Sequence, residues 1–150
     1  MHLVLYPGRG IIGALIRWQT RGRYGHAATC YDGTIYESQY PNGVKCRVFD
    51  PAKDKACGVA WYRVDCDEDK AHRFARRQIG KRYDYGSVLR FITRRQATQE
   101  SRGRWFCSEY AFAQVQKGGV SLFAETEPWE VSPSMMARSV MLHRCHCHYA

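Results

Sequence analysis

The segment 24–38 constrains the fold more than any other part of the chain. Two runs rich in β-branched and aromatic residues, 24–31 and 34–38, flank the dipeptide Asp32-Gly33. This dipeptide tolerates the positive φ angles of a tight two-residue turn. The segment is therefore predicted to form a β-hairpin.

The length of that turn decides which side chains share a face of the hairpin. With a two-residue turn, Ala28 lies opposite Glu37. His26 and Glu37 are then diagonal neighbours on one face, roughly 7 Å apart, a gap that long side chains can close. A turn of odd length would put Glu37 on the opposite face.

Other local patterns predict a mixture of strands and helices. Strands are expected over 44–49 and 58–64, and a polar surface loop over 94–104. Apolar spacing and capping signals predict helices over 11–16, 65–79, 87–93, 106–117 and from Ser132-Pro133 onwards. The helix over 65–79 is predicted to begin with a capping box from Asp65 to Glu68. The expected fold class is α+β, with a small antiparallel sheet or half-barrel packed against helices.

Length and composition set outer limits on the function. A chain of 150 residues with 45% hydrophobic content fits one domain, 1–150, with one core. No apolar run reaches the roughly 20 residues needed to span a bilayer. The first residues do not resemble a secretory signal, so synthesis in a cytoplasm is expected.

The net charge of +9 favours anionic partners. The basic residues are scattered along the chain and accompany no nucleic-acid-binding motif, which argues against nucleic acid. A solvated basic surface is the simpler interpretation. Anionic cell-wall polymers and lipid headgroups would also be attracted, so charge alone does not choose among them.

One of the seven cysteines has a distinctive position. Cys107 falls in the first turn of the helix predicted over 106–117, which ends at Gly118-Gly119. A helix N-terminus stabilises a thiolate, and its free N–H groups can donate to an oxyanion. Simple core packing is the alternative role for any cysteine at such a position.

A thiol hydrolase also needs a histidine to exchange the proton and a group that orients the imidazole ring. His26 and Glu37 offer both, although a histidine and a glutamate on a basic hairpin often form only a surface pair. The reaction assigned to Cys107, His26 and Glu37 calls for no cofactor.

Four segments carry a resemblance to a known family. In chain order they read YGHAATCYDGTIYE (24–37), GKRYDYG (80–86), FCSE (106–109) and VSP (131–133). They resemble, respectively, the histidine hairpin, the glycine-tyrosine segment, the nucleophile turn and the Ser-Pro element of NlpC-like papain-fold cysteine hydrolases. The order is that of the circularly permuted branch, in which the histidine precedes the cysteine.

The resemblance implies a role for each matching residue. Cys107 would be the nucleophile, His26 the general base and acid, and Glu37 the orienting group, the position that varies most in the superfamily. Tyr83 matches the tyrosine whose hydroxyl assists the oxyanion hole. Tyr85 or Tyr24 could take that place instead, and aromatic core packing is the alternative role for both.

The same resemblance leaves three functions open. The first is cleavage of an amide bond in a peptidoglycan peptide, which requires delivery to the cell envelope by a phage particle or another route. The second is acyl hydrolysis or transfer on lipids or proteins, as in lecithin:retinol acyltransferase. The third is an inactive module of the same fold that binds polyanions.

The C-terminal tail contains a cluster of histidines and cysteines, namely His143, Cys145, His146, Cys147 and His148. Adjacent ligands on one short tail cannot easily surround a tetrahedral metal ion, so no metal site is predicted. An edge strand or a disordered tail is expected. His72, within a charged helix, is expected to be solvated.

Overall fold

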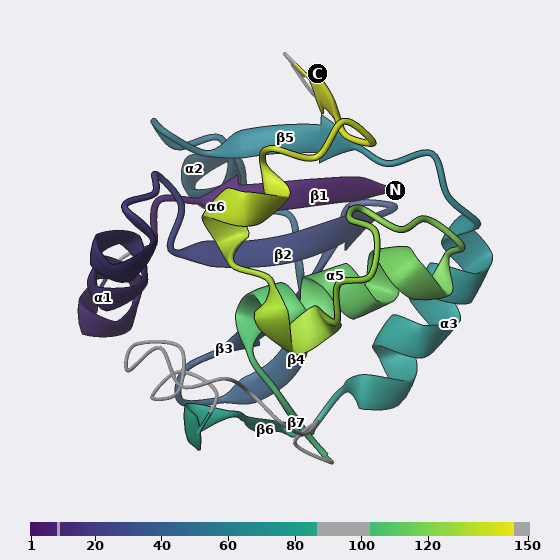
Figure 1. Cartoon of the computed structure of the whole chain (residues 1–150). Coiled ribbons are helices and arrows are strands. Elements are labelled where there is room, and N and C mark those ends of the chain that lie inside the picture. Colours follow the sequence, from purple (N-terminus) through teal and green to yellow (C-terminus); the bar gives the residue numbers. More distant parts are fainter. Residues whose placement is uncertain (9, 87–102, 146–150) are drawn as a thin grey trace.

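The computed structural model describes residues 1–8, 10–86 and 103–145 of the chain. The fold is α+β, with helices packed around a six-stranded antiparallel sheet of order β4-β3-β2-β1-β5-β8 (Figure 1). The strands of this sheet are β1 (His2–Tyr6), β2 (His26–Tyr31), β3 (Thr34–Gln39), β4 (Gly43–Val48), β5 (Ala60–Arg63) and β8 (His143–Cys145). A second, two-stranded sheet pairs β6 (Arg82–Tyr83) with β7 (Arg104–Trp105).

The helices are α1 (Gly10–Thr20), α2 (Pro51–Asp54), α3 (Glu68–Gln78), α5 (Cys107–Lys117), the 3-10 helix η1 (Pro128–Glu130) and α6 (Pro133–Met136). Those predicted over 11–16 and 106–117, and the one from Ser132-Pro133, are confirmed. Strands 44–49 and 58–64 are confirmed with small shifts in their ends. The helix predicted over 87–93 and most of the loop over 94–104 lie outside the described residues.

The predicted hairpin and its register are confirmed. Tyr31 pairs with Thr34 and Ala28 with Glu37, so the turn contains two residues. Both turn residues have positive φ, 44° at Asp32 and 68° at Gly33. An aspartate and a glycine tolerate this conformation, which matches the right-handed twist of the two strands.

The central strand β1 was not predicted. It pairs with β2 on one side and β5 on the other, and its residues from Leu3 to Leu5 are fully buried. A short, continuous apolar run does not show by its periodicity whether it is a strand or a helix. Only the neighbouring strands on both sides make this run the middle of the sheet.

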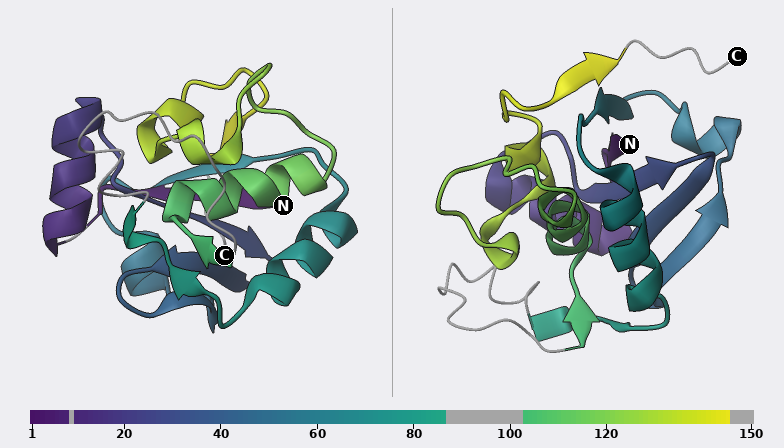
Figure 2. Two further views of the ribbon diagram at one scale, coloured as in Figure 1. Left: turned by 60° about the horizontal axis from the view of Figure 1, so that its bottom comes forward. Right: turned by 90° about the vertical axis from the view of Figure 1, so that its right-hand side faces the viewer.

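Helices α5 and α3 pack against one face of the sheet (Figures 1 and 2). The main core cluster lies on this face and includes Leu3, Leu5, Ala27 and Phe112. On the other face, Val4, Tyr6 and Ala28 belong to a second cluster. The alternation of side chains along β1 and β2 thus divides the core between two faces.

Two local predictions were wrong. The N-cap of α3 is Asp67, whose side chain accepts a hydrogen bond from the Lys70 N–H at 3.0 Å; the predicted cap, Asp65, instead pairs with Arg63. His72 is not simply solvated. Its ring stacks on Tyr31 with centroids 4.3 Å apart, and its Nε2 lies 2.8 Å from the Tyr36 hydroxyl. The hairpin across from α3 supplies these partners.

Local signals end α5 and begin α6 as predicted. Gly119, just after α5, has a φ of 87°, which suits a glycine C-terminal stop. Ser132 caps α6 by accepting from the Met135 N–H at 3.1 Å. In the tail, His143–Cys145 forms edge strand β8 on β5, so the expected edge strand is confirmed for these residues; 146–150 lie outside the described residues.

Candidate active site

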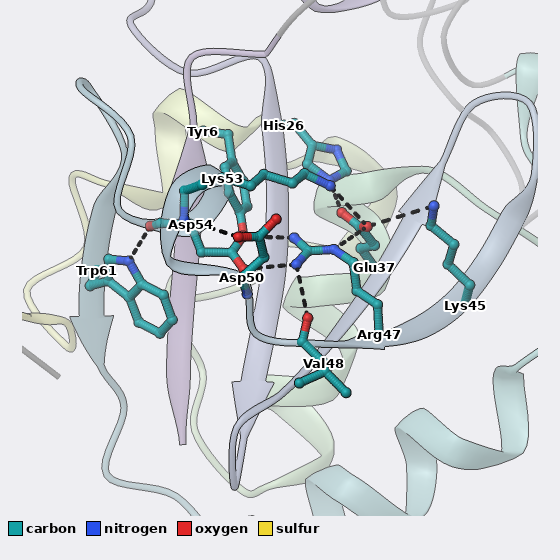
Figure 3. A network of polar contacts seen from close by, with 11 residues as sticks. Tyr6, His26, Glu37, Lys45, Arg47, Val48, Asp50, Lys53, Asp54 and Trp61 are labelled. Carbon is teal, nitrogen blue, oxygen red and sulfur yellow. Dashed lines mark hydrogen bonds and ion pairs between the residues drawn. The ribbon is translucent and has the colours of Figure 1, made fainter. Parts of the chain in front are cut away.

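The hairpin places His26 and Glu37 in direct contact. His26 begins β2, and its Nε2 lies 2.8 Å from Oε2 of Glu37 on β3 (Figure 3). The Glu37 side chain is fully buried, whereas 18% of the imidazole is exposed. The diagonal contact predicted from the turn length is therefore present.

Helix α5 begins at Cys107, as the sequence pattern predicted. Glu109, in the first turn, accepts a hydrogen bond from the Phe106 N–H at 3.1 Å. Ser108 donates to the carbonyl of Val131 at 2.6 Å and so ties the helix start to the segment before α6. These two contacts hold the first turn of α5 in place on both sides of Cys107.

The thiol of Cys107 and the imidazole of His26 meet. Cys107 is buried and lies close enough to His26 to raise the pKa of the imidazole, although the two residues are far apart in the sequence. Because Nε2 of His26 faces Glu37, Nδ1 is the ring nitrogen left for the sulfur. Cysteine, histidine and glutamate therefore lie in the order that a thiol nucleophile, its base and an orienting acid require.

The charges around the imidazole favour its protonated form. Burial by itself lowers the pKa of His26, but the hydrogen bonds and charges of Cys107 and Glu37 outweigh burial and raise that pKa to about 9. Near neutral pH the ring is then an imidazolium, which can stabilise a neighbouring thiolate and later protonate a leaving group.

Glu37 is held as a carboxylate by several cations. Burial tends to raise its pKa, but His26, Lys53 and Arg47 together lower that pKa to about 2. Nε of Arg47 lies 3.0 Å from Oε1 of Glu37, and the ammonium groups of Lys53 and Lys45 lie 3.7 Å and 3.9 Å away (Figure 3). A negative charge behind the imidazole is thereby maintained.

Arg47 joins Glu37 to a second buried carboxylate, Asp54. Two nitrogens of the guanidinium each lie 2.7 Å from an oxygen of Asp54, a bidentate contact. The Tyr6 hydroxyl and the Asp50 N–H also donate to Asp54, each at 2.8 Å. The result is a continuous chain from His26 through Glu37 and Arg47 to Asp54 (Figure 3).

Sequence reasoning missed Arg47 and Asp54. Part of the signal was present, because Glu37 pairs with Lys45, and Arg47 two residues later lies on the same face of β4. A buried acid opposite two cations at a spacing of two indicates an ion-pair cluster. The contribution of Asp54 depends on helix α2, which was not predicted.

Tyr83 is the candidate oxyanion residue that lies nearest the thiol in the packing. It shares a buried cluster with Cys107, Phe106 and Ile16. Burial and the charge of Cys107 both raise its pKa, so the hydroxyl keeps its proton. The register between β6 and β7 pairs Tyr83 with Trp105, two residues before Cys107. This pairing bridges the long interval between Tyr83 and the nucleophile.

The other two tyrosines lie in different surroundings. The ring of Tyr24 belongs to the main core cluster, which also contains Tyr62. Tyr85 is 51% exposed and makes an edge contact with Tyr83, with centroids 5.7 Å apart. Among the three candidates, Tyr83 therefore has the strongest case as the hydroxyl donor.

Other features of the described residues lie away from this site. A cavity of about 490 Å³ is lined by residues including Met1, Arg63 and Gly118, and Gly118 marks the opposite end of α5 from Cys107. Within the described ranges, no group of three potential ligands could hold a metal ion, and no helix is long and apolar enough to cross a membrane.

The sequence was also compared with known proteins. No family model matches the chain, and a search of curated proteins found no match.

Proposed function

We propose that this chain is a thiol hydrolase of the permuted papain-like type, with Cys107 as nucleophile, His26 as base and acid, and Glu37 as the orienting group. The observation that carries the proposal is the proximity of Cys107, at the start of α5, to an imidazole that contacts a buried carboxylate and whose pKa Cys107 raises. A structural cysteine needs no such partner.

The residues suggest a two-step reaction. The Cys107 thiolate attacks the carbonyl carbon, and the oxyanion accepts hydrogen bonds from the Cys107 N–H and the Tyr83 hydroxyl. His26 donates its proton to the leaving amine as the C–N bond breaks, which leaves an acyl-enzyme. His26 then takes a proton from water, the hydroxide attacks the thioester, and the acid product leaves with the Cys107 thiolate and the protonated His26 restored.

Our leading candidate substrate is an amide bond in a peptidoglycan peptide. Its basis is the resemblance of the four motifs, together with a basic chain suited to anionic cell-wall polymers. Such a substrate implies delivery of the protein to the envelope.

An acyl ester of a lipid is the second candidate. Besides lying next to His26, Cys107 shares a buried cluster with the apolar or aromatic side chains of Ile12, Ile16, Tyr83 and Phe106. An apolar surround suits an acyl chain better than a polar peptide.

Product analysis separates these candidates. The protein is incubated with purified peptidoglycan and, separately, with acyl-ester lipids, and the products are identified by mass spectrometry. We expect turnover of one substrate class, lost in the Cys107→Ala variant with its circular dichroism spectrum retained. Equal activity of wild-type protein and this variant would refute the assignment. Salt-sensitive binding to peptidoglycan or to the lipids, with no products from either, would favour the inactive binding module instead.

A further inference from the structure

Helix α1 presents an apolar face that the rest of the described chain leaves uncovered. Ile11 is 81% exposed and Trp18 is 72% exposed, and the exposed Ala14 lies between them. The spacings of three and four residues place these side chains along one side of the helix. Figures 1 and 2 show α1 at the margin of the molecule, beside the ends of β1 and β2.

The opposite face of α1 packs against the candidate active site. Ile16 is 1% exposed and belongs to the same buried cluster as Cys107 and Tyr83, and the partly buried Ile12 packs on this cluster. One helix therefore has its inner face on the cluster that contains the nucleophile and its outer face in solvent. A surface that binds the outer face would lie close to the site.

The sequence on both sides of α1 carries only positive charges. The first acidic residue in the sequence is Asp32, and the 31 residues before it contain four arginines, at positions 9, 17, 21 and 23. Arg21 and Arg23 follow α1 directly and are exposed. Exposed Ile and Trp beside cations form the pattern of a helix that lies in the interface of an anionic membrane.

We propose that the outer face of α1 (Ile11, Ala14 and Trp18) docks onto the surface of an anionic lipid bilayer. Two large apolar side chains are too few for a stable protein interface, which buries about 1,200 Å² or more. They suffice for interfacial binding when arginines add attraction to anionic headgroups. Docking on a bilayer would bring the candidate active site to the acyl-ester lipids named above as a second candidate substrate. Only this choice of substrate rests on the proposed function.

The test uses the full chain with vesicles of known composition. Sedimentation with phosphatidylglycerol vesicles measures binding, and phosphatidylcholine vesicles supply the neutral comparison. We expect binding to the anionic vesicles that weakens with salt, and at least tenfold weaker binding for Ile11→Ser/Trp18→Ser. The matched control is Val140→Ser, because Val140 is 91% exposed and lies outside the α1 surface. Arg21→Gln/Arg23→Gln should lower the affinity about thirtyfold for anionic vesicles alone, at about 1 kcal/mol for each arginine.

Three results would overturn the proposal. They are absence of binding to phosphatidylglycerol vesicles at low salt, unchanged binding of Ile11→Ser/Trp18→Ser, and a dimer in analytical ultracentrifugation that this double variant abolishes. The last result would identify a second copy of the chain as the occupant. Because Cys107→Ala should bind vesicles as tightly as the wild type, docking is measured independently of any hydrolysis.

Discussion

Replacing Arg47 by methionine is the sharpest test of the charge network behind the imidazole. Arg47 is 19% exposed, whereas both carboxylates that it contacts, Glu37 and Asp54, have fully buried side chains. Methionine fills much of the same volume without the charge. The variant would leave Asp54 without its bidentate partner, and Glu37 with His26 and the more distant Lys53 and Lys45.

The expected loss of stability at pH 7 is about 3 kcal/mol. Removing one partner from a buried ion pair costs about 3–5 kcal/mol, because the remaining charge stays buried and uncompensated. We take the lower end because Lys53 and Lys45 remain 3.7 Å and 3.9 Å from Glu37. The free energy of unfolding from urea titrations measures this difference.

The dependence on pH gives the effect a specific signature. The folded pKa of Glu37 is about 2, below the reference value of 4.5, and despite burial the pKa of Asp54 is also lowered, chiefly by its hydrogen bond to Arg47. These carboxylates therefore stabilise the wild-type fold above pH 4.5, a contribution lost as the pH falls toward 2. Without Arg47 their folded pKa values rise, so the difference between variant and wild type should shrink between pH 7 and pH 3.

The control is Arg63→Met, which removes an exposed ion pair with Asp65. Both side chains of that pair are more than half exposed, so the expected change is under about 0.5 kcal/mol. A loss below about 1 kcal/mol for Arg47→Met, independent of pH, would refute the reasoning.

Three further predictions follow from the site and its supports. Glu37→Gln removes a negative charge that raises the pKa of His26 above its reference value. The alkaline fall of kcat/KM, which is expected near pH 9 in the wild type, should therefore move to lower pH in this variant. An unchanged pH profile would contradict this role of Glu37. Ser134→Ala removes the hydroxyl that bonds the buried N–H and carbonyl of Tyr24, at 2.9 Å and 3.0 Å. The two unpaired groups should lower the free energy of unfolding, measured with urea, by about 2 kcal/mol. Little change would contradict the bridging role of Ser134. Gly25→Ala would place a Cβ 2.5 Å from a backbone oxygen of α1 and should lower the free energy of unfolding by about 2 kcal/mol; full stability would mean that α1 shifts freely.

The hairpin was accessible from the sequence because its determinants are local. Asp32-Gly33 selects the turn, and the turn length then decides that His26 and Glu37 share a face. The placement of Cys107 in the first turn of a helix was equally local, since apolar spacing and Gly118-Gly119 mark that helix. Each of these signals acts within a few residues.

The wrong and missing predictions had competing or distant partners. Asp65 fits a capping pattern, but Asp67 caps α3 while Glu68 pairs with the N-terminal amine of Met1. His72 lies on a charged helix, and only the packing of α3 against the hairpin brings Tyr31 and Tyr36 to its ring. Sequence periodicity contains no information about such neighbours.

The sequence by itself determined the turn, its register and the helix start that carries the cysteine, because short-range backbone geometry sets all three. Tertiary structure decided that β1 lies at the centre of the sheet, that β6 and β7 bring Tyr83 toward Cys107, and that Arg47 meets Asp54. The contact between Cys107 and His26 belongs to this second group. It depends on how the strands are ordered and on which helix covers them, and those long-range choices are made by burial of the whole core rather than by any local pattern.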